Sequence, residues 1–530
     1  MKPLATDSAL LDALGQRAKK HLRARLSATR QALPPSAVQA RSARIVEALA
    51  SLGPLRAARA VADGSDPLLL IPWVDKPPLV LYLLALSLKL FGPSESSLRA
   101  PGMLASVLTV LGTYGLAWRM VGKRAALLAA ALLALSPFAI LFGPTAFTDP
   151  WLTLFVIGAA WAAVAGQPLW SGVLLGLACA SKQQGVFGAP LILALLVAAE
   201  IPHADRSRRA SVILKRIGLA LLGFAPVFGA VTYWDSLRWH NRPSYWDQSL
   251  RTYGGVALVP LVEWPQRTGE WMRQLGHLSG APAISALLLF VAGISLRPGQ
   301  IKADSKDRRS RWTFLLAGYV LCYLLVHLIF SFQPWDRYLL PILPLICILA
   351  GRGLLDGWSM LRRYLPAGTV KWAPALLGLV LIYVASLGVT AQIPVGSDIH
   401  AYEGVAEAAH LLAQQPAGTT VYYDRLGWHL GYYLYDLPIE RSWYDGPAKL
   451  AREAARVARE QPDTPQWLML PRWELDSLAS LEEALADRGF VARPHATTVA
   501  ANGTAGPTLY RIEQVLKIAG MAGAPVESTQ

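Results

Sequence analysis

Long apolar runs separated by short polar segments are the main pattern of this chain. Such runs predict membrane-spanning helices, because about 20 apolar residues cross the hydrocarbon core of a bilayer. Several runs are shorter, so helix tilt or imprecise edges must be allowed for. The predicted spans are about ten, at 97–119, 125–143, 150–165, 168–181, 185–200, 215–234, 280–296, 313–332, 338–351 and 372–393.

The last quarter of the chain has a different pattern. Residues 395–530 alternate between strand-like and helix-like segments. The strand-like segments are TTVYYDRLGW, PQWLML and TLYRIEQV, and the helix-like segments are AKLAREAARVAREQ and SLEEALADRG. This alternation predicts a small α/β domain. The fold class is therefore mainly α, a polytopic membrane protein with a C-terminal α/β domain.

Composition agrees with a membrane protein. Of the 530 residues, 53% are hydrophobic and 16% are charged, against about 25% charged in a typical soluble domain. The net charge of +15 could indicate nucleic acid, but the basic residues concentrate between apolar runs. We therefore interpret them as positive-inside loops and expect no nucleic-acid partner.

The basic loops assign sides to the membrane part. One set of alternate connections is rich in Lys and Arg and should be cytoplasmic; it contains Arg119, Lys123, Arg124, Arg206, Arg208, Arg209, Lys215, Arg216, Arg297, Lys302, Lys306, Arg308, Arg309, Arg311, Arg352, Arg362, Arg363 and Lys371. The opposite set should be outside. It comprises FTDPW (147–151), SKQQG (181–185), the Trp-rich loop 235–278, FQPWDRY (332–338) and everything after about 394. The α/β domain is therefore predicted to be extracytoplasmic.

A further apolar run, 77–92, leaves two alternatives. The following run ends at basic residues, so it begins outside. If 77–92 crosses the membrane, the preceding Asp75 and Lys76 are cytoplasmic. If it lies along the outer surface, they share a side with Asp149. The run is short for a span, but Lys89 within it could snorkel in either arrangement.

Several polar residues at these boundaries are candidates for chemistry. Asp149 in FTDPW is favoured as a helix start, with Thr148 or Asp149 as N-cap and Pro150 in the first turn. That role is compatible with a general base or a cation ligand. Lys76 and Lys182 are either interfacial anchors or point charges for a phosphate. Arg337 either pairs with Asp336 or grips a phosphate.

The long loop RWHNRPSYWDQSLRTYGG (238–255) is dense in Trp, Arg and Tyr. It is either an interfacial aromatic belt or a lid that binds a sugar or a lipid phosphate. Trp246, Arg251 and Tyr253 are its candidate substrate-binding residues. His240, His277 and His327 lack metal-ligand spacing, and the three cysteines form no metal signature, so no metal-ligating residues are predicted.

Three segments together resemble a known family. WVDKPPLVLYLLALSLKLFGPSESSLRAPGMLASVL, LALSPFAILFGPTAFTDPWLTLF and RYLLPILPLI are similar to the GT-C superfamily of polyprenyl-phosphate-dependent glycosyltransferases, which includes protein O-mannosyltransferases and lipid A aminoarabinose transferases. The resemblance covers about 72–515. It implies a polyprenyl-phosphate-linked sugar as donor, transfer on the outer face, and a surface helix after Asp-Lys-Pro-Pro.

Carried over residue by residue, the resemblance assigns roles. Lys76 would contact the lipid phosphate, with Arg337 as a second phosphate-binding candidate. Lys182 is a phosphate-binding candidate from its position in the sequence alone. Asp75 and Asp149 would be the catalytic carboxylates, with Asp75 as a candidate cation ligand. A divalent cation stays an open candidate as cofactor. The family's first span and its outer loop with Asp-Glu find no counterpart before Asp75, where only Asp63 and Asp66 precede it closely.

The beginning of the chain resembles another protein. Residues 17–62 are similar to the N-terminal helices of 5-formyltetrahydrofolate cyclo-ligase, so we predict a helical fragment at 1–62, a membrane domain at 63–394 and the α/β domain at 395–530. The sequence thus predicts a glycosyltransferase of the inner (plasma) membrane, with a membrane lipid and a glycan, lipid or protein acceptor as partners. The alternatives are an inactive fusion or misjoined product without the first catalytic loop, and a lipid-handling transporter.

Overall fold

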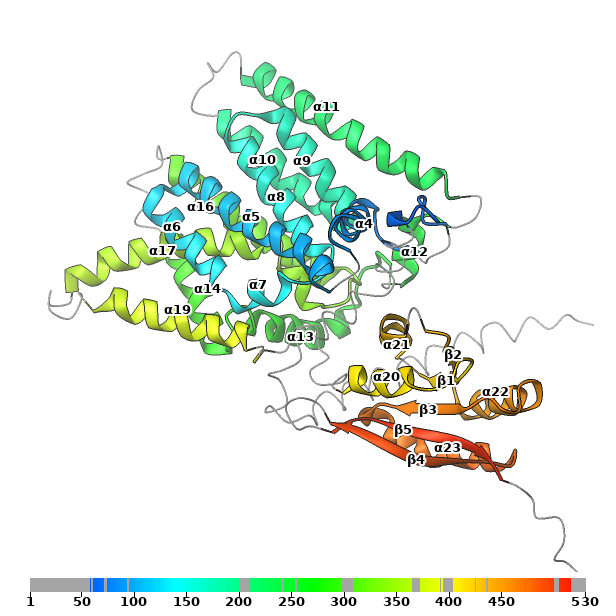
Figure 1. The fold of residues 1–530 in the computed structure, drawn as a ribbon. Coiled ribbons are helices and arrows are strands. Elements are labelled where there is room, and N and C mark those ends of the chain that lie inside the picture. Colours follow the sequence, from blue (N-terminus) through cyan, green and yellow to red (C-terminus); the bar gives the residue numbers. More distant parts are fainter. Residues whose placement is uncertain are drawn as a thin grey trace, which may run out of the picture.

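The structure, a computed structural model, divides into a helical bundle and a C-terminal sheet domain (Figure 1). It describes residues 58, 61–70, 74–92, 95–200, 209–239, 243–252, 255–297, 308–364, 372–390, 392–393, 404–424, 426–434, 437–499 and 505–515. The fragment predicted at 1–62 lies outside these residues except for positions 58, 61 and 62.

Apolar helices build the bundle, as the hydrophobic pattern predicts. Among the described residues, four helices are long and apolar enough to cross a membrane, and six shorter helices are also apolar. The helices of this part are α4 (Leu79–Phe91), α5 (Glu95–Val121), α6 (Lys123–Ala134), α7 (Pro137–Phe142), α8 (Asp149–Val164), α9 (Pro168–Ser181), η2 (Gln183–Phe187), α10 (Gly188–Glu200), α11 (Arg209–Ser236), α12 (Tyr245–Thr252), η3 (Leu261–Glu263), α13 (Trp264–Gly276), α14 (Pro282–Ile294), α16 (Arg308–Ile329), η4 (Asp336–Leu339), α17 (Leu343–Tyr364) and α19 (Ala373–Val389).

One predicted span is interrupted. The run 125–143 is divided into α6 and α7 because Pro137 cannot continue the helix of the preceding turn. The hydroxyl of Ser136 accepts a hydrogen bond from the backbone N–H of Ala139 at 3.4 Å and caps α7. The prediction of one continuous helix is therefore wrong here.

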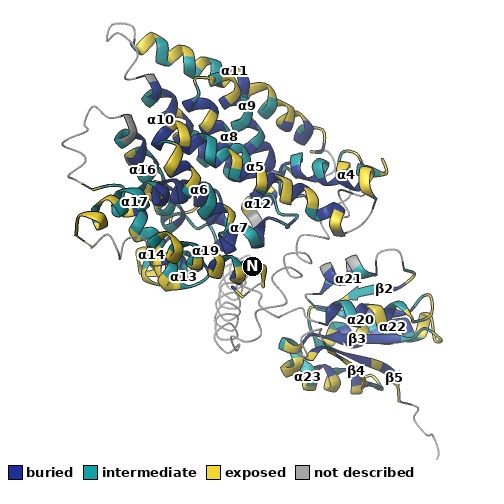
Figure 2. Cartoon of the chain, turned by 60° about the vertical axis from the view of Figure 1, so that its left-hand side comes forward, coloured by how far each residue is buried: buried dark blue, intermediate teal, exposed yellow. Residues whose placement is uncertain are grey.

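The surface of the bundle is apolar where a lipid would cover it. Helix α11 exposes Leu214, Leu221, Leu222 and Tyr233, and Figure 2 shows exposed residues along much of its length. Its inner side packs closely on α9, since a Cβ atom on Gly172 would overlap the carbonyl group of Ala220. Close approach through small residues is typical of helix packing in membranes.

Helix α4 corresponds to the apolar run 77–92. It has 13 residues, which at 1.5 Å per residue gives about 20 Å, against about 30 Å for the hydrocarbon core. Figure 1 views α4 nearly end-on, whereas α9 and α11 lie lengthwise in the same view, so α4 runs across their ends. Both observations favour the alternative in which this run lies along the membrane surface.

The C-terminal domain is a five-stranded sheet between two layers of helices. The strand order is β2-β1-β3-β5-β4, with β2, β1 and β3 parallel and β5 and β4 antiparallel. Helices α20 and α21 pack on one face and α22 and α23 on the other. The elements are α20 (Val405–Ala413), β1 (Thr420–Tyr423), α21 (Gly427–Tyr433), β2 (Glu440–Trp443), α22 (Pro447–Glu460), β3 (Gln466–Leu470), η5 (Arg472–Ser477), α23 (Leu478–Ala486), β4 (Phe490–Val499) and β5 (Ala505–Gln514).

The five segments predicted in this domain are all confirmed, whereas β2, β4, α20 and α21 were not predicted. Strand β2 has only four residues and reads ERSW, so it lacks a recognisable apolar alternation. The predicted fold class, a mainly helical membrane protein with a small C-terminal α/β domain, is confirmed.

Candidate functional site

A buried ion pair joins two of the predicted residues. The ammonium of Lys182 donates a hydrogen bond to Oδ1 of Asp149 at 2.6 Å, and the two side chains are 4% and 1% exposed. Asp149 is the first residue of α8, followed by Pro150 as predicted. Thr148 is the N-cap residue, but its side chain makes no capping hydrogen bond. Capping by the Thr148 hydroxyl, one of the two predicted options, is therefore not made. The Asp149 carboxylate instead contacts Lys182.

The Asp-Lys-Pro-Pro segment lies beside this pair. Lys76 Nζ is 2.8 Å from Oδ2 of Asp75. The amide of Gln183 donates to the backbone carbonyl of Asp75 at 2.6 Å and to that of Tyr245 at 3.5 Å. Gln183 therefore ties the segment before α4 to the turn after α9 and to α12. Sequence reasoning missed Gln183, although it stands next to Lys182 in SKQQG.

Arg337 and Tyr338 complete the cluster from η4. The ring of Tyr338 lies 4.6 Å below the Lys182 ammonium, and the Arg337 guanidinium stacks over Trp335 at 4.0 Å and Phe147 at 5.0 Å. Arg337 Nε is buried and has no hydrogen-bond partner in the part of the chain that the structure describes. The backbone N–H of Arg337 donates to Oδ1 of Asp336 at 2.7 Å. Asp336 is buried, so this contact differs from the surface pair that was one of the two predicted alternatives.

The electrostatics of the cluster show that its cations act on one another. Burial lowers the pKa of Lys182, which lies between α9 and η2; the Asp149 charge opposes this, and the charges of Arg337 and Lys76 add to it. Burial also lowers the pKa of Lys76, against the effect of Asp75, and Arg337 again adds to the lowering. An anion placed among these three cations would relieve their mutual repulsion.

Local sequence explains why the loops adopt these positions. Pro77 and Pro78 lack backbone N–H groups and lead into α4, which begins at the next residue. The turn that carries Lys182 requires Gly185, because a Cβ atom there would overlap the backbone of Ala178 and Cys179. The five charged side chains of the cluster thus come from three segments at the ends of apolar helices and one short 3₁₀ helix. They belong to Asp75, Lys76, Asp149, Lys182 and Arg337.

The structure describes only part of the long loop 238–255. Trp246 in α12 is 37% exposed and neighbours Tyr245, whose carbonyl is contacted by Gln183. The side chain of Arg251 and the whole of Tyr253 lie outside the described residues. Their substrate-binding roles stay predictions.

The remaining titratable groups do not form a metal centre within the described ranges. No group of three or more His, Cys, Asp or Glu is placed there to hold a metal ion. His327 is enclosed by aromatic rings, including Tyr323 at 4.2 Å, and its Nδ1 contacts the Tyr323 carbonyl at 2.9 Å. His240 lies outside the described residues.

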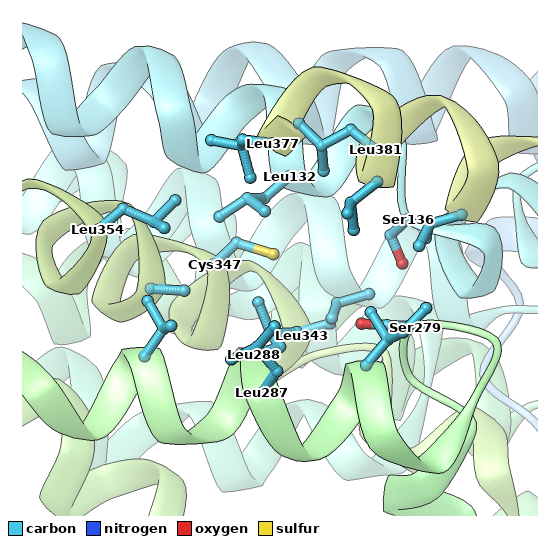
Figure 3. Close-up of a pocket in the computed structure, with 15 residues that line it drawn as sticks. Leu132, Ser136, Ser279, Leu287, Leu288, Leu343, Cys347, Leu354, Leu377 and Leu381 are labelled. Carbon is cyan, nitrogen blue, oxygen red and sulfur yellow. The ribbon is translucent and has the colours of Figure 1, made fainter. Parts of the chain in front are cut away.

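An apolar cavity lies away from these charges. It has a volume of about 90 Å³ and is formed by α6, α14, α17 and α19 (Figure 3). Its lining residues include no acidic or basic side chain, and the labelled polar groups, Ser136 and Ser279, lie together at one end. This cavity therefore has no part in acid–base chemistry, and the candidate active site is the charged cluster.

Comparison with known proteins gives one family match over part of the chain. The family model described as dolichyl-phosphate-mannose-protein mannosyltransferase matches residues 75–230. The match includes Asp75, Lys76, Asp149 and Lys182. A search among curated proteins finds no match.

The fold is similar to that of a solved structure, and two others give TM-scores below 0.5. ArnT from Cupriavidus metallidurans in the apo state is 16% identical, with a TM-score of 0.56, over 88% of this chain and 96% of that one. The same protein bound to undecaprenyl phosphate gives 16% identity and a TM-score of 0.48, covering 91% and 98%. The oligosaccharyltransferase AglB from Archaeoglobus fulgidus, with an inhibitory peptide and a dolichol-phosphate, gives 12% and 0.47, covering 82% and 66%.

Proposed function

Since the resemblance to the GT-C glycosyltransferases is confirmed, we propose that this chain transfers a sugar from a polyprenyl-phosphate donor to an acceptor outside the cytoplasm. The observation that carries the proposal is the cluster in which Lys76, Lys182 and Arg337 lie near two carboxylates, with the Lys182–Asp149 pair buried and the other groups partly exposed. A cation cluster at the ends of apolar helices suits the phosphate of a lipid whose chain stays in the bilayer.

The proposed chemistry divides the cluster into two parts. The Asp149 carboxylate accepts the proton of the acceptor hydroxyl while the acceptor oxygen forms a bond to the sugar's anomeric carbon. The bond from that carbon to the phosphate oxygen breaks, and its electron pair leaves with the polyprenyl phosphate. Lys76 and Arg337 stabilise the charge that develops on this leaving group.

Lys182 has a double role in this scheme. Before the donor arrives, its ammonium holds the Asp149 carboxylate in a 2.6 Å ion pair. A bound phosphate would compete for the same ammonium and draw it away from Asp149, which would free the carboxylate to act as a base. Asp75 keeps Lys76 in place through their 2.8 Å contact.

The roles of Lys76 and Asp149 are tested by substitution. Lys76→Ala should lower transfer at least about 100-fold, as for the loss of one charge-stabilising group. Asp149→Asn should lower it by about 100-fold or more through loss of the base. Transfer of radiolabelled sugar from a polyprenyl-phosphate donor in membranes is the measurement.

Two matched substitutions control for charge and for insertion. Lys89→Ala removes an exposed lysine of α4, and Asp247→Asn removes an exposed carboxylate of α12. Both should transfer at the wild-type rate, and all four variants should reach the membrane. Asp149→Asn should in addition be the least stable of the four, because it leaves the buried Lys182 ammonium without its partner. Wild-type transfer by Lys76→Ala or Asp149→Asn removes that residue from the mechanism.

A further inference from the structure

The carboxyl ends of three parallel strands meet in the C-terminal domain. Asp424 follows β1, Tyr444 follows β2, and Glu474 lies in η5 directly after β3. None of these residues belongs to the charged cluster of the helical bundle. The domain carries its own helices on both faces, and this edge of the sheet is where its polar and aromatic side chains gather.

The strand order places a crevice at this edge. The chain leaves central strand β1 through α21 to reach β2, and then crosses the other face through α22 to reach β3. Strand connections that run to opposite faces leave a crevice at the carboxyl ends of the strands, where open α/β sheets bind their ligands. In the order β2-β1-β3 that crevice lies at the carboxyl end of the central strand β1, which β2 and β3 flank.

Tyr444 places a buried hydroxyl group at this edge of the sheet. Its side chain is 4% exposed, and its hydroxyl has no hydrogen-bond partner in the described ranges. A buried hydroxyl without a partner is costly and calls for an explanation. Burial raises the pKa of Tyr444, and the charges of Glu474 and Asp424 raise it further. The backbone N–H of Tyr444 donates to the carbonyl of Tyr423 at 3.1 Å, next to Asp424.

An indole ring borders the same crevice. Trp443 is 49% exposed, and its Nε1 donates to Oδ1 of Asp424 at 3.3 Å. The ammonium of Lys449 lies 4.0 Å from the centroid of the Trp443 ring. The edge therefore combines a partly exposed aromatic ring, two carboxylates, an ammonium and an unpartnered hydroxyl.

These groups match the chemistry of a sugar ring. Carboxylates accept hydrogen bonds from hydroxyl groups, a tyrosine hydroxyl both donates and accepts, and the C–H face of a pyranose is apolar enough to stack on indole. A metal ion suits the site less well, because the described residues contain no group of three or more metal-ligating side chains.

We propose that this crevice is a carbohydrate-binding site, separate from the transfer site, for a neutral sugar unit. The Tyr444 hydroxyl forms a hydrogen bond with a sugar hydroxyl, Asp424 and Glu474 accept from its neighbours, and Trp443 stacks on the ring. The inference concerns binding alone and does not rest on the transfer reaction.

Saturation-transfer NMR on the full chain in nanodiscs tests this site. The probes are methyl α-D-mannopyranoside, methyl β-D-glucopyranoside and methyl α-D-arabinofuranoside, each at millimolar concentration. At least one should receive saturation from the protein. Tyr444→Phe should weaken its binding about fivefold, the loss expected for one hydrogen bond, and Trp443→Ala should weaken it at least as much.

The unfolding temperature of Tyr444→Phe and the binding of a matched control variant distinguish a ligand-binding hydroxyl from a structural one. Tyr444→Phe removes a hydroxyl that has no protein partner, so its unfolding temperature should equal or exceed that of the wild type; a purely structural hydroxyl would lower it. Tyr510→Phe, in β5, should bind as the wild type does. Absence of saturation for all three glycosides, or unchanged binding by Tyr444→Phe, overturns the proposal.

The outcome is also distinguishable from that of the transfer proposal. Lys76→Ala should bind the glycoside normally while it loses transfer. A wild-type chain that transfers sugar but binds none of the probes would contradict only the crevice.

Discussion

At the scale of single residues, the pair of Lys182 and Asp149 is the most consequential contact of the membrane part. The two residues are 33 positions apart, and neither side chain has more than 4% exposure. Because each charge is removed from water, each depends on the other for compensation. The pair therefore links the stability of the bundle to the chemistry of the site.

Removal of one partner should cost more than removal of both. We expect Lys182→Met to lower the free energy of unfolding by about 3 kcal/mol, because it leaves the buried Asp149 carboxylate uncompensated. The double variant Lys182→Met with Asp149→Asn should recover much of this loss without recovering transfer. Thermal unfolding in detergent measures both, with Lys89→Met as the exposed-lysine control; a single variant as stable as the wild type would show that the pair does not hold the bundle together.

At the scale of elements, the segment before α4 is held by the end of α11. Leu69 is fully buried and has a φ of 57°, a left-handed conformation unusual for a branched side chain. Its carbonyl accepts hydrogen bonds from Nε of Arg238 at 3.2 Å and from Nη2 at 2.9 Å. Arg238 is 1% exposed and also lies 3.7 Å from Asp235. This contact fixes the chain a few residues before Asp75 and Lys76.

Substitution of Arg238 should therefore affect donor binding at the charged cluster, although Arg238 is not one of the cluster residues. Arg238→Met leaves the Leu69 carbonyl and the Asp235 carboxylate without this donor, which should cost about 2 kcal/mol or more. We also expect a higher KM for the lipid donor, because Lys76 loses its fixed position. Arg362→Met, at the exposed end of α17, is the matched control. An unchanged KM in a folded Arg238→Met protein would separate this contact from donor binding.

At the scale of the whole molecule, topology decides whether the site can work. Figure 1 shows the end of α10 and the start of α11, and the end of α17 and the start of α19, on the side of the bundle away from the C-terminal domain. The basic segments predicted to be cytoplasmic follow α10 and α17 in the sequence. The charged cluster and the sheet domain are then predicted to share the outer side.

Cysteine labelling in intact cells checks this arrangement. In a background with Cys179→Ala, Cys322→Ser and Cys347→Ala, a membrane-impermeant maleimide should label Ser65→Cys and Ser480→Cys directly. Ser359→Cys, near the end of α17, should be labelled only after permeabilisation. If Ser65→Cys also requires permeabilisation, Asp75 and Lys76 lie inside and the assignment of Lys76 to a phosphate on the outer face fails.

Much of the fold follows from local pattern. Apolar runs determine where the helices lie, Pro150 and Pro168 mark the first turns of α8 and α9, and the amphipathic segment at 448–461 predicts α22. Such signals depend on neighbours within a few residues. The break at Ser136-Pro137 was also visible in the sequence but was outweighed by the surrounding leucines and alanines.

By itself the sequence determined the membrane class, the α/β domain and the identity of the charged residues at the helix ends. Only the tertiary structure decided which of them meet. The pairing of Lys182 with Asp149, the contact of Gln183 with Asp75 across 108 residues and that of Arg238 with Leu69 across 169 residues arise from helix packing, which no local periodicity encodes. The same holds for the surroundings of the Tyr444 hydroxyl, which form because three parallel strands end at one edge of the sheet.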